Sequence, residues 1–266
     1  MTPEDFALYF KETTPWPDYS NTCDGFKAGN PKQPITKVAV SWKASWGALK
    51  FAQDNGCNFF ISHESIFTNG ANGNEMELKH YHAMETKKAQ WITESGLCIY
   101  RCHDTVDLLP DFGIRDQWAK GLGFSDFEIK GEPAYYTLCH TEPVTLVQLA
   151  YDIGKKIKPL GENGVLIFGD PDRVICTVAT GTGAITDPFI MASYNPDCCI
   201  LTDDFFRTVR EGEFLLESGL CAIMVNHGVS EEWGMQAFCG YLKENFPEVE
   251  FVFVPHTCIY RHVVTS

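Results

Sequence analysis

The sequence is poor in positive charge and has no long apolar run, and both deficits exclude classes of function. Lys and Arg number 21 against 35 Asp and Glu, which gives a formal net charge of −14. Such a chain repels phosphate backbones and anionic lipid surfaces, and it attracts cations. No apolar stretch reaches the roughly 18 residues that a membrane span needs. We therefore expect no nucleic-acid partner and no membrane partner.

None of the 11 cysteines forms a C-x-x-C pair, so the spacing of a zinc knuckle is missing. The first residues lack the basic and apolar regions of a secretory signal peptide. We therefore expect a cytoplasmic protein. Because disulfides are rare in the cytoplasm, we expect its thiols to be reduced and mostly buried as small hydrophobic side chains.

The composition is otherwise that of a globular protein. The 266 residues are 44% hydrophobic and 13% aromatic, enough for one large α/β unit or two lobes. Short apolar runs at 38–40 and 59–61 flank a helical stretch at 46–54, which predicts a β-α-β unit with a parallel sheet. Elsewhere the pattern predicts a helix opened by Thr2 and closed before Pro15, a loop over 16–34, an amphipathic helix at 145–157 and a strand at 250–254.

The chain also repeats itself. The pentapeptide Glu-Ser-Gly-Leu-Cys occurs at 94–98 and again at 217–221, and in each copy it leads into an apolar strand. The first strand ends at His103 and the second at His227, and each histidine has a carboxylate four residues later, Asp107 or Glu231. The repeat is therefore aligned through its polar residues.

The β-α-β unit recurs as well, with strands expected at 174–178 and 199–201. The second of these ends at Thr-Asp-Asp, residues 202–204, as the earlier one ends at Ser-His-Glu, residues 62–64. We therefore predict an α/β fold of two related lobes from an internal duplication, with a metal site at their interface. The predicted halves are residues 1–125 and 126–266, with 126–172 as a linking stretch and the C-terminal strands interleaved with the first half.

A histidine at a strand end with a carboxylate one helical turn later is typical of half of a divalent-metal site. Two such half-sites favour two metal ions per chain, about 3.5 to 4 Å apart, whose bridging water becomes a nucleophile near neutral pH. The predicted ligands are three imidazoles and three carboxylates: His63, Glu64, His103, Asp107, His227 and Glu231. Glu64 or Asp104 is the candidate general base, although Glu64 is equally placed to cap the following loop.

Other polar residues near the strand ends are expected to be supporting or solvated, namely Asp203, Asp204 and Glu232. We expect the remaining histidines to be structural or exposed: His80, His82, His140, His256 and His262.

Four segments resemble the NGG-one-interacting factor three-like family, also described as dinuclear-metal-centre hexameric or GTP cyclohydrolase type 1-like proteins. Residues 24–29 resemble its early D-N-x-G-L-x-x-G segment, and 60–67 its H-H-P strand end. Residues 103–107 are similar to H-T-n-l-D, and 226–231 to G-H-x-x-T/S-E. The resemblance implies two α/β lobes, a homohexamer with metal sites facing an internal cavity, and His63, Asp107, His227 and Glu231 as ligands with His103 at or beside them.

The chain departs from this pattern at Glu64 and Ser65, where the family has a second histidine and a proline. The oxygen ligand at Glu64 favours iron, manganese or magnesium somewhat over zinc. The family's central T-G-E segment is Thr-Asp-Asp here, at 202–204.

Two functions are compatible with these residues. The first is a metal-dependent hydrolase that acts on a small-molecule substrate through a metal-bridging water, with GTP cyclohydrolase-like activity by analogy only. The second is a non-catalytic metal-binding or regulatory protein, because the sequence has no Gly-rich phosphate loop and no cofactor fingerprint that would define a substrate.

Overall fold

The computed structural model describes residues 1–67, 75–204 and 206–263 of the chain. These residues form two compact units. The first unit comprises Met1–Leu109 and Phe238–Pro255, and the second comprises Pro110–Ala237 and His256–Ser266. Each unit has its own sheet and its own helices, so the chain has an α/β fold.

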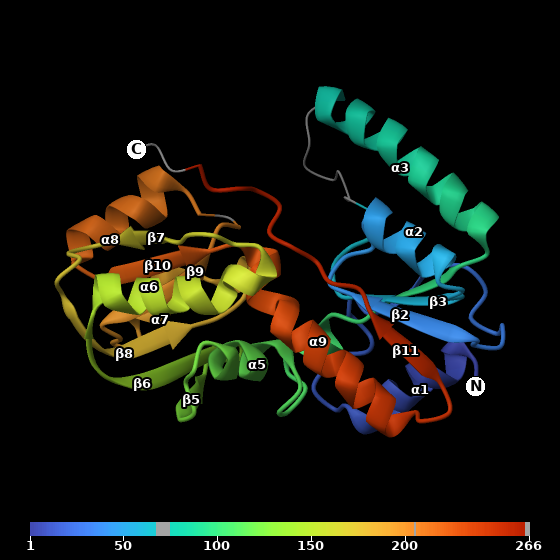
Figure 1. Ribbon diagram of the computed structural model, residues 1–266, viewed down its shortest axis with the longest axis horizontal. Coiled ribbons are helices and arrows are strands. Elements are labelled where there is room, and N and C mark those ends of the chain that lie inside the picture. Colours follow the sequence, from blue (N-terminus) through green and yellow to red (C-terminus); the bar gives the residue numbers. More distant parts are fainter. Residues whose placement is uncertain (68–74, 205, 264–266) are drawn as a thin grey trace. The chain divides into compact units, whose positions relative to one another are not determined.

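The first unit is built on a five-stranded sheet in the order β1-β4-β3-β2-β11. Strands β3, β2 and β11 of this sheet are labelled in Figure 1. Four of its strands are parallel, and the edge strand β1 runs antiparallel to β4. The strands are β1 (Gly25–Ala28), β2 (Lys37–Ser41), β3 (Phe59–Ser62), β4 (Cys98–Arg101) and β11 (Glu250–Phe253).

Helices cover both faces of this sheet. Along β3, Phe60 faces an apolar cluster that includes Leu49 of α2 and Ile92 of α3, whereas Phe59 faces the aromatic rings of α1. This alternation is what a strand buried on both faces requires. The helices are α1 (Pro3–Thr13), α2 (Trp46–Asp54), α3 (Glu75–Ser95), the short α4 (Asp104–Asp107) and the end of α9 (His227–Asn245).

The second unit has a six-stranded mixed sheet in the order β5-β6-β8-β9-β10-β7. Strands β8, β9 and β10 are parallel, and the outer strands pair antiparallel. The strands are β5 (Phe127–Lys130), β6 (Tyr136–Thr145), β7 (Leu166–Phe168), β8 (Val174–Thr180), β9 (Cys198–Thr202) and β10 (Cys221–Val225).

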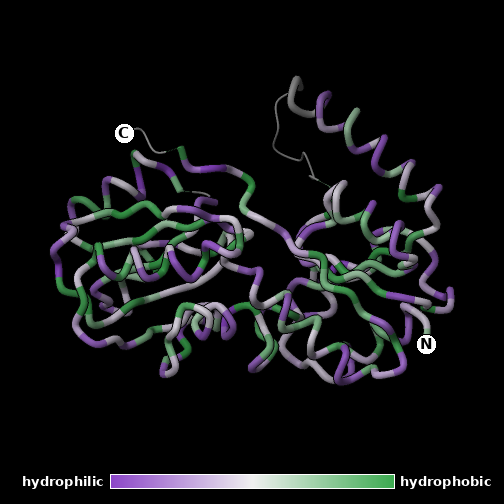
Figure 2. The backbone as a smooth tube through the Cα atoms, in the orientation of Figure 1, coloured by the Kyte–Doolittle hydropathy of each residue, from purple (hydrophilic) through white to green (hydrophobic). Residues whose placement is uncertain are grey.

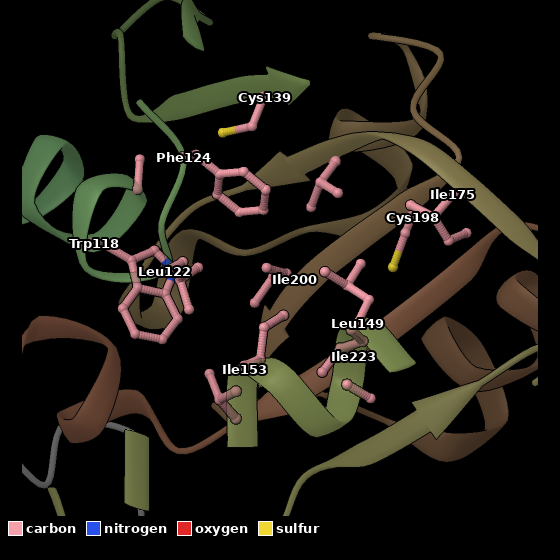
Figure 3. Close-up of a cluster of buried hydrophobic side chains, with 14 of the residues drawn as sticks. Trp118, Leu122, Phe124, Cys139, Leu149, Ile153, Ile175, Cys198, Ile200 and Ile223 are labelled. Carbon is pink, nitrogen blue, oxygen red and sulfur yellow. The ribbon is translucent and has the colours of Figure 1, made fainter. Parts of the chain in front are cut away.

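One face of this sheet packs on α5 (Ile114–Gly121) and α6 (Leu146–Ile157) through a large apolar core (Figure 3). Trp118 of α5 and Ile153 of α6 are almost fully buried there, against Ile200 and Ile223 of the central strands. The other face packs on α7 (Pro188–Ala192) and α8 (Glu213–Ser218). Hydrophobic residues concentrate in the strands, as Figure 2 shows. The short helical turns are η1 (Lys158–Leu160), η2 (Gly183–Ile185) and η3 (Thr208–Gly212).

Most of the expected elements are present. Thr2 caps α1 in a reciprocal hydrogen-bonded box with Asp5, and Thr145 caps α6. Strands β2 and β3 flank α2 as a parallel β-α-β unit. No helix in the described ranges, 1–67, 75–204 and 206–263, is long and apolar enough to cross a membrane.

Some strands were not expected from the sequence. The expected loop at 16–34 contains β1, and the linking stretch at 126–172 contributes β5, β6 and β7 to the second sheet besides its expected helix, α6. These strands are short or alternate polar with apolar residues, so no continuous apolar run marks them. The two compact units differ in bounds from the predicted halves, and the duplication itself stays a prediction.

Candidate metal centre

Four of the predicted ligands lie together in the first unit, at the carboxyl ends of neighbouring parallel strands. His63 and Glu64 follow β3, and His103 and Asp107 follow β4. In α/β sheets these strand ends are where ligands bind. We call these four residues the first half-site.

The two imidazoles of the first half-site are stacked. Their ring centroids are 4.2 Å apart and the rings are nearly parallel. Asp107 faces both rings, since its Oδ1 lies 3.6 Å from Nε2 of His63 and its Oδ2 lies 3.2 Å from Nδ1 of His103. His63 is fully buried. One carboxylate therefore faces two imidazole nitrogens inside the protein, which is a donor set that suits a divalent ion.

The two carboxylate oxygens of Glu64 face different groups. Its Oε2 accepts the backbone N–H of Ser65 at 3.0 Å and lies 3.5 Å from the guanidinium of Arg101. Its Oε1 lies 3.9 Å from Nε2 of His103. One oxygen therefore holds the loop while the other faces an imidazole, so the geometry is compatible both with a cap and with a metal ligand.

A short helix sets the spacing of His103 and Asp107. Helix α4 has only four residues, too few to be stable alone. The carboxylate of Asp24 accepts the backbone N–H groups of residues 103, 104 and 105, with distances of 2.5, 3.0 and 3.0 Å. A carboxylate at a helix N-terminus satisfies otherwise unpaired donors and favours the helix dipole. Asp24 thus fixes the turn that places His103 beside Asp107.

The pKa values of His103 and Asp104 are shifted by the charges around them. Burial of His103 favours the neutral ring, but the carboxylates of Asp107 and Asp104 outweigh burial and raise the pKa of His103 above its usual value. The hydrogen bond from His103 in turn lowers the pKa of Asp104 below its usual range. Surroundings that hold a positive charge on an imidazole also favour a divalent cation in its place.

The second unit carries the other two predicted ligands, which form the second half-site. His227 and Glu231 lie one turn apart at the start of α9, with Nε2 of His227 3.2 Å from Oε2 of Glu231. Both residues are buried. The predicted histidine–carboxylate spacing therefore brings the two side chains into contact, as it does for His103 and Asp107.

Two aspartates after β9 orient His227. Its ring Nδ1 donates to Asp204 at 2.6 Å, and its backbone N–H donates to Asp203 at 2.8 Å. With Nδ1 donating to a carboxylate, Nε2 is the nitrogen that can bind metal. Asp203 also accepts from the side chain of Asn226 at 2.9 Å. The supporting role expected for Asp203 and Asp204 matches these contacts.

Gly183 allows its backbone to approach the second half-site closely. Its φ of +59° is left-handed, and a Cβ at this position would collide with Oε1 of Glu231 and lie 2.9 Å from Nε2 of His227. Its backbone N–H donates to Ser230 of α9 at 3.4 Å. The missing side chain therefore lets the Gly183 backbone lie against the Glu231 carboxylate and the His227 ring. The imidazole and carboxylate of the second half-site are donors that suit a divalent metal ion.

The other polar residues considered from the sequence lie elsewhere. Glu232 is buried and accepts the backbone N–H of His256 at 2.7 Å, and burial raises the pKa of Glu232 to about 8. It therefore supports the C-terminal segment. His80, His82 and His140 are exposed.

The comparison with known families covers almost the whole chain. The Duf34/NIF3 (NGG1p interacting factor 3) family matches residues 1–258. This chain belongs to the Duf34/NIF3 family.

Two curated proteins that are similar to this chain have the same name. The chain is 24% identical over 226 residues to "GTP cyclohydrolase 1 type 2 homolog" of Chlamydia pneumoniae, across 84% of this chain and 86% of that protein. It is 24% identical over 238 residues to the Pseudomonas aeruginosa protein of the same name, across 85% of both. The solved "Bacillus cereus protein related to NIF3" has a TM-score of 0.79 at 14% identity, across 99% of both chains. That likeness confirms the fold.

Sequence reasoning missed two residues that shape the half-sites. Asp24 was noted only as part of a family segment, and Gly183 was not considered. Neither carries a local signal, because each acts on a helix far away in the sequence. Around Gly183 the sequence Gly181-Thr182-Gly183 does not differ from that of an ordinary turn.

We predict that Gly183→Ala weakens metal binding at the second half-site at least about tenfold, the lower end of the losses seen when the surroundings of a metal are disturbed. The added Cβ would displace Glu231 or His227. Isothermal titration with Mn²⁺ or Zn²⁺ measures the change.

Gly219→Ala is the matched control for this variant. Gly219 has a similar φ of +70°, but a Cβ there meets no atom within 4 Å. Both variants carry the backbone strain of about 1–2 kcal/mol, and only Gly183→Ala should affect metal. Equal affinity in the two variants would contradict the role assigned to Gly183.

Proposed function

We propose that this Duf34/NIF3 protein binds two divalent metal ions per chain and uses them to hydrolyse a small-molecule substrate. The observation that carries the proposal is the same arrangement in both units: a histidine contacts a carboxylate one helical turn later, at the end of a parallel strand. In both units a further aspartate accepts the backbone N–H of that histidine. The prediction that the half-sites serve one dinuclear centre belongs to this proposal.

The donor set is typical of a catalytic metal site rather than of a structural zinc site, which is usually rich in cysteine. It offers imidazole nitrogens and carboxylate oxygens, a mixture that suits iron, manganese, zinc or magnesium. The net charge of −14 raises the local concentration of cations. Bound ions of this kind act as Lewis acids that activate water and polarise a carbonyl or phosphoryl group.

Residues of this chain orient the histidines and provide a group that can accept a proton. Asp204 holds the His227 ring through Nδ1, and Asp24 holds the turn that carries His103. Glu64 keeps Oε1 directed at His103, where it is placed to bind a metal or to accept a proton. Asp104 is engaged by three groups of the segment before β1, Thr22 Oγ1, Cys23 N–H and Cys23 Sγ, so Glu64 is the stronger candidate for the general base.

The test combines metal analysis with a substrate panel. Protein purified without oxygen is analysed for metal and then assayed, loaded with the metal found, on phosphate esters, cyclic amides and GTP, the last because of the relatives' name. Turnover that is lost in His227→Ala and in Asp107→Ala supports the hydrolase. Stoichiometric metal with no turnover on any class would instead support the non-catalytic metal-binding function.

Oligomerisation is part of the same proposal. The family resemblance implies a homohexamer, and native mass spectrometry of the metal-loaded protein measures the number of chains directly. A monomer at micromolar concentration would contradict it.

The role of Glu64 is open to a direct prediction. Glu64→Gln keeps the size of the side chain but removes an anionic ligand, so we expect affinity for one metal ion to fall at least about tenfold while the fold survives. Titration with Mn²⁺ and thermal melting measure the two effects. Unchanged metal content with turnover reduced ~100-fold would make Glu64 the general base instead.

A third outcome of Glu64→Gln is possible. If Glu64 only caps the loop through Ser65, the metal content of Glu64→Gln stays at wild-type level and its stability falls by about 1 kcal/mol. Glu64→His restores the family's paired histidines and should shift preference towards zinc, because imidazole is the softer donor. Exposed Glu94→Gln is the control for loss of one carboxylate.

A further inference from the structure

A second group of potential metal-binding atoms includes Nδ1 of His103, the nitrogen that also faces Asp107 in the first half-site. Sγ of Cys23, a ring nitrogen of His103 and a carboxylate oxygen of Asp104 all lie within 4.8 Å of one another. Nε2 of His103 is the nitrogen nearest Glu64, whereas Nδ1 is the nitrogen nearest Asp104. The sequence analysis treated the cysteines as buried hydrophobic residues, and Cys23 is only half-buried.

The donor atoms of this group lie about as close together as the ligands of one metal ion. Nδ1 of His103 lies 3.1 Å from Oδ1 of Asp104, and Sγ of Cys23 lies 3.4 Å from the same oxygen. Donors bound to one tetrahedral ion at about 2.0–2.3 Å lie roughly 3.3–3.7 Å apart. Oδ2 of Asp107, 3.2 Å from the same nitrogen, is a fourth donor within reach.

Neighbouring groups hold the donors in this arrangement. The other oxygen of Asp104, Oδ2, accepts the hydroxyl of Thr22 at 2.7 Å and the backbone N–H of Cys23 at 3.3 Å. These bonds turn Oδ1 towards the sulfur and the imidazole. Asp24, which follows Cys23 in the chain, is fixed to the N-terminus of α4 because its carboxylate accepts three backbone N–H groups there. Supporting hydrogen bonds of this kind orient the ligands in metal sites.

We propose that Cys23, Nδ1 of His103 and Asp104 form a thiolate-containing site for a divalent ion such as Zn²⁺. A neutral imidazole offers one lone pair, so His103 serves this site through Nδ1 and the first half-site then depends on His63, Glu64 and Asp107. Binding releases the thiol proton to solvent. The thiolate selects softer ions than the nitrogen and oxygen donors of the first half-site do. This site goes beyond the proposed hydrolytic function, and an ion bound here takes up the His103 nitrogen that otherwise faces Asp107.

Cobalt(II) reports directly on sulfur ligation. Metal-free protein, kept reduced with a phosphine in place of a thiol, is titrated with CoCl₂ under nitrogen. We expect wild type to develop the near-ultraviolet thiolate-to-cobalt charge-transfer band, Cys23→Ser to lose it, and Cys176→Ser to keep it. Cys176 is the matched control, because it is also a free, half-buried cysteine. Cobalt binding by wild type without that band, or the band persisting in Cys23→Ser, overturns the proposal.

Alkylation of the unmutated protein gives a second measurement. Saturating Zn²⁺ should slow the reaction of Cys23 with iodoacetamide at least about tenfold, since the bound thiolate is no longer a free nucleophile, and should leave Cys176 unaffected. Equal rates with and without Zn²⁺ overturn the proposal.

The experiments distinguish failure of the hydrolase proposal from failure of the thiolate-site proposal. If cobalt binds with its charge-transfer band but no substrate is turned over, the thiolate site stands and the hydrolase does not. If metal supports turnover but no thiolate band forms, the reverse holds.

Discussion

A His227→Ala, Glu231→Ala double variant should retain less than about half of the metal bound by wild type, because it removes both donors of the second half-site. The side chains contact each other at 3.2 Å, and both are buried. We expect the fold to survive, since alanine favours the helix that carries both positions. Elemental analysis after gel filtration, together with titration, measures the loss.

The control for this variant removes the same residue types away from the site. His140 and Glu244 are exposed, so a His140→Ala, Glu244→Ala protein should bind metal as wild type does. Wild-type metal content in the His227→Ala, Glu231→Ala protein would refute the assignment of the second half-site. Combining that protein with Asp107→Ala tests the dinuclear prediction, because half-sites that share a centre give losses that do not add.

Removal of metal should lower the melting temperature by about 10 °C. A ligand held only by the folded state, at a free concentration a thousandfold above its Kd, stabilises by about 4 kcal/mol, and each kcal/mol corresponds to roughly 2–4 °C in a protein approaching this size. Carboxylates of the first half-site also repel one another without a cation. Differential scanning calorimetry before and after verified chelation measures the shift.

The same scan of the His227→Ala, Glu231→Ala protein is the internal comparison. Chelator should move its melting temperature less than that of wild type. A wild-type melting curve that does not change after complete metal removal would show that the half-sites contribute nothing through a bound ion.

The sequence was informative wherever the signal was local. Strands β2, β3, β4 and β10 are continuous apolar runs, which is the pattern of strands buried on both faces. The spacing of His103 to Asp107 and of His227 to Glu231 follows from one turn of helix, and both pairs are in contact. Periodicity and repetition are sufficient for predictions of this kind.

The remaining features arise from residues that meet only in the folded chain. Asp24 precedes the N–H groups that it caps by about eighty positions, and Cys23 reaches Asp104 for the same reason. Gly183 matters because of atoms on α9, which follows more than forty residues later. Nothing within a few residues of these positions distinguishes them from ordinary loop residues.

The two aspartates that anchor the half-sites differ in how much chain they enclose. The hydrogen bond from the His103 N–H to Asp24 closes 79 residues, whereas that from the His227 N–H to Asp203 closes only 24. Loop-closure entropy grows with the logarithm of length, so the first contact costs about 1 kcal/mol more to form from an open chain. During folding the second half-site can therefore assemble from a local β-α-β segment, while the first waits until distant parts of its unit have come together.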